Sequence, residues 1–267
     1  MPTGRPAVSV LMAVRDGAPW VREAVESVLA QTAADLELIV IDDDSGDATQ
    51  DLLGDFTDAR LRVERLARRE GLTRSLNRAL ALARAPLVAR LDADDIALPE
   101  RLARQRAFLE AQADVGLLGT GAREVDASGR ELGVVRPPTD DAGIRRALIR
   151  SNPFVHSSVM ARRTIVEQAG GYDETFPVAQ DYDLWMRVSR HARLANLPEL
   201  LVIRRILPGR ISEAREAERL RAEARVRWRA VRGGAYPVWC AVHVLRPVMA
   251  LALPRPVRRL LRGRARD

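Results

Sequence analysis

The sequence predicts an α/β protein, with a mostly parallel sheet flanked by helices and then a basic helical tail. Two observations carry this prediction. Continuous apolar runs such as Val8–Val14 are typical of strands buried on both faces. Segments with helical spacing of apolar residues alternate with these runs, which indicates βαβ units. A chain of 267 residues can form a full core, and its single cysteine, Cys240, excludes an intrachain disulfide framework.

The first half is expected to alternate between strand and helix. The expected strands are Val8–Val14, Leu36–Ile41, Leu61–Leu66 and Leu87–Leu91. The expected helices are Trp20–Gln31, Ala48–Phe56, Thr73–Ala85 and Pro99–Gln112, the last because proline is favoured at the first helical position. Such sheets bind ligands at the carboxyl ends of their strands, so functional residues are expected there.

The second half is less regular. Its expected strands are Val115–Thr120 and Val155–Ala161, and its expected helices are Asp140–Arg150, Thr164–Ala169 and Gln180–His191. An Arg-dense helix is expected from about Glu213 to Arg232. Pro208–Gly209 interrupts the pattern, so we expect one compact domain over residues 1–212 and a helical tail over residues 213–267.

The net charge of +7 belongs to the tail rather than to the body of the chain. Residues 1–200 carry 26 Arg and 31 acidic residues, whereas residues 201–267 carry 17 Arg and 5 acidic residues. The basic isoelectric point alone would suggest a nucleic-acid-binding protein. A body of net negative charge repels nucleic-acid phosphates, so no nucleic-acid partner is expected.

Two acidic clusters follow predicted strands. Asp42-Asp43-Asp44 follows the second strand, and Asp92-Ala93-Asp94-Asp95 follows the fourth. One interpretation of either cluster is a solvated acidic turn that caps the next helix. Both clusters fall at the same edge of the predicted sheet, which favours a binding site instead. Oxygen-only ligands of this kind suit Mg²⁺ or Mn²⁺ and leave coordination positions for a diphosphate.

The order and spacing of several motifs resemble those of family 2 glycosyltransferases, which have the GT-A fold. The resemblance covers roughly residues 7–205. Its segments are, in order, Val8–Gly17, Ser27–Thr32, Glu37–Thr49, Gly71-Leu72 with Asn77, the D-x-D element Asp92–Asp95, and Gln180–Trp185. Arg15-Asp16 departs from the family's usual aromatic–Asn pair, and Arg69 stands where the family often has Asn.

The resemblance implies an inverting sugar transfer from a nucleotide-diphosphate donor to a hydroxyl group. It places the donor half at about residues 7–115 and the acceptor half at about residues 116–212. Asp181 matches the general base, and His156 and Trp185 fall in the acceptor region. Asp94 and Asp95 match the positions that hold Mg²⁺ or Mn²⁺. The implied donor-binding residues are Ala13, Arg15, Asp43, Asp92 and Asp94.

The implied substrates follow from the same positions. The carboxylate of Asp43 only accepts hydrogen bonds, so it suits the ring N–H of uracil, thymine or guanine in a UDP-, dTDP- or GDP-sugar. The resemblance implies a glycan or lipid-linked acceptor in bacterial cell-surface glycan assembly. The N-terminus lacks the pattern of a signal peptide, so a cytoplasmic location is expected.

One alternative enzyme class is a phosphatase of the haloacid dehalogenase type, which also carries D-x-D after a strand. Its motif lies near the N-terminus and is followed closely by Thr or Val. Here Asp94 is followed by Asp95-Ile96 in the middle of the chain, so this alternative is disfavoured.

The tail segment Ala235–Leu253 is apolar but contains Pro237, Arg246 and Pro247. A central Arg costs at least about 2.5 kcal/mol in a spanning helix, so a helix lying in the membrane interface is expected instead. Flanking Arg residues on both sides, including Arg255–Arg266, would meet anionic lipid. The alternative is a helix that packs on the catalytic domain or on a second subunit.

Overall fold

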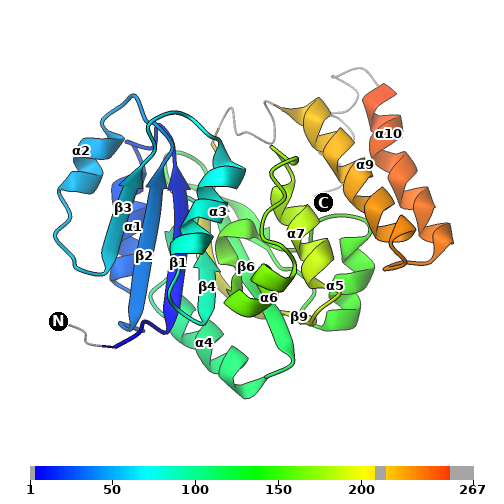
Figure 1. The fold of residues 1–267 in the computed structure, drawn as a ribbon, viewed down its shortest axis with the longest axis horizontal. Helices are drawn as coiled ribbons and strands as arrows, with labels where there is room; N and C mark the ends of the chain where they lie inside the picture. Colours follow the sequence, from blue (N-terminus) through cyan, green and yellow to red (C-terminus); the bar gives the residue numbers. More distant parts are fainter. Residues whose placement is uncertain (1–3, 208–214, 253–267) are drawn as a thin grey trace.

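The computed structural model describes residues 4–207 and 215–252 (Figure 1). Within these residues, nine strands form one sheet in the order β3-β2-β1-β4-β8-β6-β9-β5, with β7 paired to β6. Helices flank the sheet (Figure 1). The predicted α/β class is therefore confirmed.

The strands of the first half run parallel, as predicted. They are β1 (Val8–Val14), β2 (Leu36–Asp42), β3 (Leu61–Arg65) and β4 (Leu87–Arg90), with α1 (Val21–Leu29), α2 (Thr49–Gly54) and α3 (Leu72–Leu82) between them. β1 and β2 are buried at every position, which agrees with their continuous apolar runs. Both acidic clusters follow strands of this parallel set, so they lie at the same edge of the sheet.

The second half of the sheet is mixed. β8 (Met160–Arg162) runs antiparallel to β4 and β6 (Val115–Val125), while β9 (Arg193–Arg205) runs parallel to β6. The short strands β5 (Ile96–Ala97) and β7 (Glu131–Val135) pair antiparallel with β9 and β6. The helices here are α4 (Arg101–Ala111), α5 (Asp141–Leu148), α6 (Arg163–Gln168) and α7 (Gln180–Val188).

The structure differs from the sequence predictions in three places, two in the second half and one at the start of the helix predicted from Pro99. β9 was not predicted because Pro198 and Glu199 interrupt its pattern; the structure accommodates them with a register shift, in which Leu197 and Leu200 face adjacent residues of β6. The expected strand Val155–Ala161 is instead the 3₁₀ turn η1 (His156–Ser158) followed by β8. α4 begins at Arg101 rather than Pro99, because Arg101 N–H closes a turn on Leu98 O.

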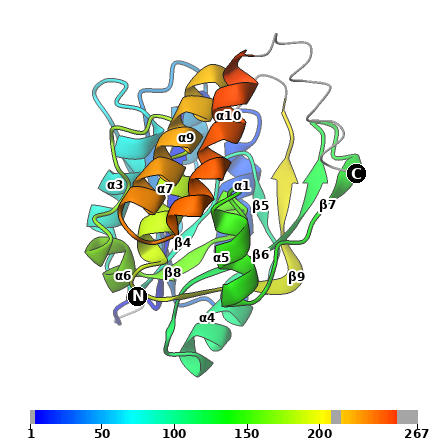
Figure 2. The ribbon, with the colours of Figure 1, turned by 90° about the vertical axis from the view of Figure 1, so that its right-hand side faces the viewer.

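The tail forms a helical hairpin of α9 (Glu216–Arg232), the 3₁₀ turn η2 (Val238–Ala241) and α10 (Val242–Ala252). α10 lies along α9, and α9 lies beside α7 (Figures 1 and 2). Val226, Ala230 and Val231 of α9 belong to the same buried cluster as Trp185 of α7. The first tail helix is therefore part of the main core.

The domain boundary predicted between residues 212 and 213 lies outside the described residues, as do Arg255–Arg266. Within the described residues, no helix is both long and apolar enough to cross a membrane.

Candidate active site

A cavity of about 620 Å³ lies beside the carboxyl ends of the strands. It brings together five residues predicted from sequence: Asp92, Asp94, Asp95, His156 and Asp181. These come from three separate segments, namely the loop after β4, the turn η1 and the start of α7. The sheet topology therefore unites groups that lie almost ninety positions apart in the chain.

Three predicted donor-binding residues, Ala13, Arg15 and Asp43, are not among the residues that line this cavity. Asp43 lies beside the end of β1, because its N–H donates to Val14 O at 2.8 Å. Its carboxylate is only 4% exposed and accepts the backbone N–H groups of Glu70 (2.6 Å) and Gly71 (2.9 Å). Asp43 therefore fixes the loop before α3. Its proposed contact with a base stays a prediction.

Asp92 is anchored by a buried cation. Arg90 in β4 pairs with Asp92, and Ser157 Oγ donates to the other carboxylate oxygen at 2.7 Å. Burial alone would raise the pKa of Asp92. The charge of Arg90 and the Ser157 hydrogen bond outweigh burial and hold that pKa at about 2. Asp92 is therefore ionised at neutral pH.

The pKa values of Asp94 and Asp95 are shifted in the opposite direction, upward. Burial, followed by the negative charge of Asp92, raises the pKa of Asp94 to about 6 and that of Asp95 to about 8. Ser157 Oγ contacts both Asp92 and Asp95 but has one proton to donate. A protonated Asp95 carboxyl can donate to Ser157 Oγ, which agrees with its raised pKa.

Arg205, at the end of β9, holds this loop in place, and sequence reasoning missed it. Its backbone N–H donates to Asp95 Oδ1 and its guanidinium donates to Asp94 O, both at 2.8 Å. The guanidinium also pairs with Glu23 and lies 4.6 Å from the centre of the Trp20 ring. Its neighbour Arg204 lines the cavity and pairs with Glu124 at 3.3 Å. No local pattern marks either Arg, because both depend on the unpredicted strand β9.

Asp181 is the second residue of α7 and is partly exposed to the cavity. Ala179, just before the helix, has a φ of 58°, a left-handed conformation that is uncommon for alanine. One Asp181 oxygen accepts a hydrogen bond from Asn152 at 2.6 Å. Within the described residues the other oxygen accepts no hydrogen bond from a side chain, so it can accept a proton from a ligand.

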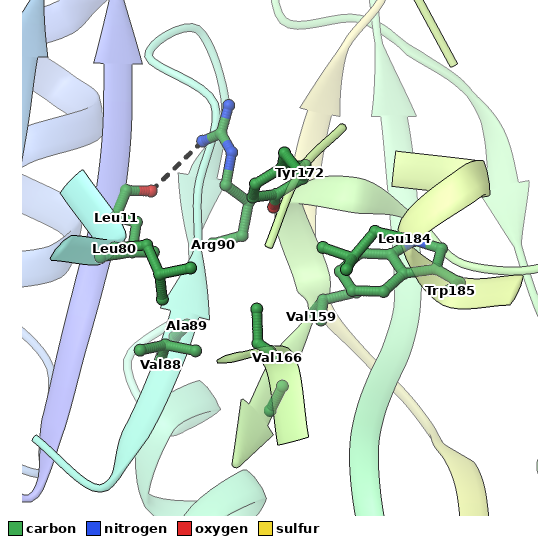
Figure 3. Close-up of a pocket in the computed structure, with 11 residues that line it drawn as sticks. Leu11, Leu80, Val88, Ala89, Arg90, Val159, Val166, Tyr172, Leu184 and Trp185 are labelled. Carbon is green, nitrogen blue, oxygen red and sulfur yellow. Dashed lines mark hydrogen bonds between the residues drawn. The ribbon is translucent and has the colours of Figure 1, made fainter. Parts of the chain in front are cut away.

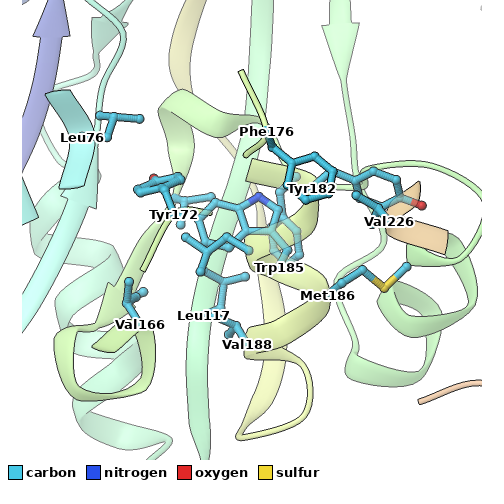
Figure 4. Close-up of a cluster of buried hydrophobic side chains, with 14 of the residues drawn as sticks. Leu76, Leu117, Val166, Tyr172, Phe176, Tyr182, Trp185, Met186, Val188 and Val226 are labelled. Atoms are coloured by element: carbon cyan, nitrogen blue, oxygen red, sulfur yellow. The ribbon is translucent and has the colours of Figure 1, made fainter. Parts of the chain in front are cut away.

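His156 and Trp185 occupy different environments. His156 lines the cavity, and its Nε2 lies 3.1 Å from Tyr172 Oη. Burial, followed by the charge of Arg90, lowers the pKa of His156, so the imidazole is neutral at pH 7. Trp185 does not line this cavity; it is buried among Leu117, Tyr172 and other core side chains (Figure 4).

A second, much smaller cavity adjoins Arg90 (Figure 3). Its volume of about 20 Å³ suits one water molecule rather than a substrate. Two of its lining groups, Arg90 Nε and Trp185 Nε1, have no hydrogen-bond partner in the described part of the chain. A cavity this small, lined mainly by apolar side chains, is not a candidate for the substrate site.

The Asp92–Asp95 loop fits a divalent cation that is held jointly by the protein and a substrate. Across residues 4–207 and 215–252, no group of three or more His, Cys, Asp or Glu side chains is arranged to hold a metal alone. Mg²⁺ is commonly held by one or two carboxylates together with substrate phosphates. Both Asp95 oxygens already have partners, whereas the Asp94 carboxylate accepts no hydrogen bond from another described residue. Asp94 is therefore the carboxylate best placed to bind such a cation.

The Asp92–Asp95 loop at the carboxyl edge of the sheet and Asp181 of α7 thus line one cavity. The family described as "Glycosyl transferase family 2" matches residues 9–170. This chain belongs to family 2 of the glycosyltransferases. That assignment displaces the phosphatase alternative.

Individual relatives agree with the family. The O-antigen biosynthesis glycosyltransferase WbnJ of Escherichia coli is 32% identical over 205 residues, covering 74% of this chain and 79% of WbnJ. S. aureus TarS 1-349 in complex with UDP-GlcNAc superposes with a TM-score of 0.68 at 20% identity, covering 82% of this chain and 66% of that one. The mannosyltransferase PcManGT from Pyrobaculum calidifontis, in complex with GDP-Man and Mn2+, superposes with a TM-score of 0.66 at 21% identity. That superposition covers 99% of this chain and 81% of PcManGT. These two structures confirm the fold.

Proposed function

We propose that this chain transfers a sugar from a nucleotide-diphosphate donor to a hydroxyl acceptor, with inversion at the anomeric carbon. The observation that supports this most strongly is the single cavity lined by both the Asp92–Asp95 loop and Asp181. A general base at Asp181 that activates the acceptor hydroxyl suits a direct displacement.

Each residue then has a distinct role. Asp94 would hold Mg²⁺ or Mn²⁺, while Asp95, whose oxygens already have partners, would fix the loop beside it; the cation would neutralise charge that builds on the departing diphosphate. Arg204 would bind a phosphate oxygen from the same side of the cavity. Asp181 would remove the proton of the attacking hydroxyl, while Asn152 holds its carboxylate in place.

The substrates and setting are part of the same proposal. Asp43 suits a UDP-, dTDP- or GDP-sugar, and the TarS and PcManGT structures contain donors of the first and third kinds. WbnJ acts in O-antigen biosynthesis, which supports an acceptor in cell-surface glycan assembly. We place the reaction in the cytoplasm, at the inner face of the cell membrane.

Donor binding is testable by thermal shift. UDP-, dTDP- and GDP-sugars are each added with Mn²⁺, and the matching donor at a hundredfold excess over its Kd should raise Tm by about 5–10 °C. ADP-glucose is the control, because adenine has no ring N–H where uracil, thymine and guanine have the one that Asp43 would accept. A failure of all three donors, or an equal shift with ADP-glucose, would contradict the proposal.

Membrane association is the part of the proposal that concerns the tail. The outward side chains of η2 and α10 are largely apolar: Trp239 is 73% exposed, and Val238, Val242, Leu245, Val248 and Met249 are also exposed, as is Trp228 of α9. On α9, exposed Arg221, Arg225, Trp228 and Arg232 recur at the spacing of one helix face. Aromatic and apolar side chains combined with Arg favour an anionic membrane surface.

Vesicle flotation tests this surface in the full chain, because removing the tail would also remove core residues of α9. The triple variant Trp239→Ser, Val242→Ser, Leu245→Ser should lose flotation with vesicles rich in phosphatidylglycerol. Leu132→Ser, which changes a comparably exposed apolar residue on β7, should float like the wild type. Equal flotation of the triple variant, or no flotation of the wild type, would contradict membrane association.

A further inference from the structure

Part of the wall of the candidate site cavity is formed by α9. Arg219 and Glu223 of this helix line the same cavity as Asp181. α9 lies beyond residues 9–170, the part that matches the family. Like Asp181, these two side chains therefore line the cavity from outside the segment that the family model covers.

Glu223 is held rigidly in the cavity wall. Its carboxylate lies between Arg219 and Arg227, and it is 18% exposed. Arg227 is buried and donates to Arg150 O, His243 O and Tyr182 Oη at 2.8, 3.2 and 3.2 Å. These contacts tie Glu223 to the segment before η1 and to α7, the helix that carries Asp181.

The cavity combines this fixed acceptor group and this fixed donor group with apolar surface. Leu72, Phe154, Val155, Pro177 and Val178 supply the apolar lining. A sugar ring has the complementary character, because its hydroxyl groups both donate and accept while its C–H faces are apolar. Arg219 supplies hydrogen-bond donors and Glu223 supplies acceptors within one ion pair, so the two side chains together can bind sugar hydroxyl groups.

We propose that Arg219 and Glu223 form the acceptor subsite, binding hydroxyl groups of the terminal sugar of an acceptor glycan. This inference rests on the proposed glycosyl transfer. The pair fixes the sugar so that its reactive hydroxyl meets Asp181, and it makes no contact with the donor. Its loss should reduce acceptor use and leave reaction of the donor with water unchanged.

Kinetics with p-nitrophenyl glycosides of glucose, galactose, mannose and N-acetylglucosamine test this subsite. Arg219→Ala and Glu223→Ala should each lower kcat/KM for the glycoside used by about tenfold to a hundredfold. Hydrolysis of the donor without acceptor should stay at the wild-type rate. Glu223→Gln should recover part of the loss, because the amide keeps one acceptor oxygen.

Glu218→Ala is the matched control. Glu218 is an exposed carboxylate on the same helix, paired with Arg215 and outside the cavity lining. Arg219→Ala leaves the Glu223–Arg227 pair in place, so it separates acceptor binding from any loss of stability in Glu223→Ala. Three outcomes overturn the subsite: acceptor kinetics like those of Glu218→Ala, an equal loss of donor hydrolysis, or a wild type that hydrolyses donor but uses no glycoside. A wild type that neither binds nor hydrolyses any donor overturns the proposed function itself.

Discussion

Replacing Asp181 by Asn should lower sugar transfer by about 10²–10⁴-fold while nucleotide binding stays unchanged. Asn keeps the shape of the side chain and removes its ability to take a proton. Donor binding should persist, because the donor-side groups Asp92, Asp94 and Arg205 belong to other elements. Steady-state transfer rates and calorimetry with the nucleotide measure the two effects separately.

Glu174→Gln is the control for this substitution. Glu174 is an exposed carboxylate shortly before α7, and it does not line the cavity. Its variant should transfer sugar at the wild-type rate. Turnover of Asp181→Asn within a few-fold of wild type would mean that another group removes the proton.

Asp94→Ala should weaken Mn²⁺-dependent nucleotide binding on the order of 100-fold, because the cation loses its main protein ligand. Calorimetry with UDP or GDP, whichever binds the wild type, measures this loss in the presence of Mn²⁺. Glu100→Gln, an exposed carboxylate just before α4, should bind like the wild type. Unchanged nucleotide affinity in Asp94→Ala would contradict a cation site at this loop.

The raised pKa of Asp94 adds a pH dependence to the same measurement. A cation binds the ionised carboxylate, so protons compete with it at pH values below the pKa. Because burial and Asp92 raise that pKa to about 6, Mn²⁺-dependent affinity should fall as the pH drops through about 6 rather than through about 4. Constant affinity between about pH 5 and 7 would contradict the raised pKa.

The first half of the fold could be predicted because each element there has its own local signal. The strands β1 and β2 are apolar throughout, and the helices between them keep regular spacing. β9 lacks such a signal, since its pairing with β6 absorbs Pro198 and Glu199 through a register shift. Long-range pairing, not propensity, forms that strand.

The site residues divide in the same way, into those with a local sequence signal and those that depend on long-range contacts. Asp92, Asp94 and Asp95 could be found because several acids follow one strand directly, and Asp181 because its motif resembles the family's. Arg205 could not, because its contact with Asp95 spans 110 positions of the chain. Arg219 and Glu223 were missed for a related reason: on a helix of alternating charges they have the same spacing as ordinary surface pairs.

The most direct test of the account is the release of nucleoside diphosphate from UDP-, dTDP- and GDP-sugars by the purified full chain. Wild-type protein with Mn²⁺ should release the diphosphate from one donor, and EDTA should abolish that release. Asp94→Ala should be inactive in the same assay. Release that continues undiminished in EDTA, or no release from any of the three donors, would contradict a cation-assisted nucleotide-sugar transferase.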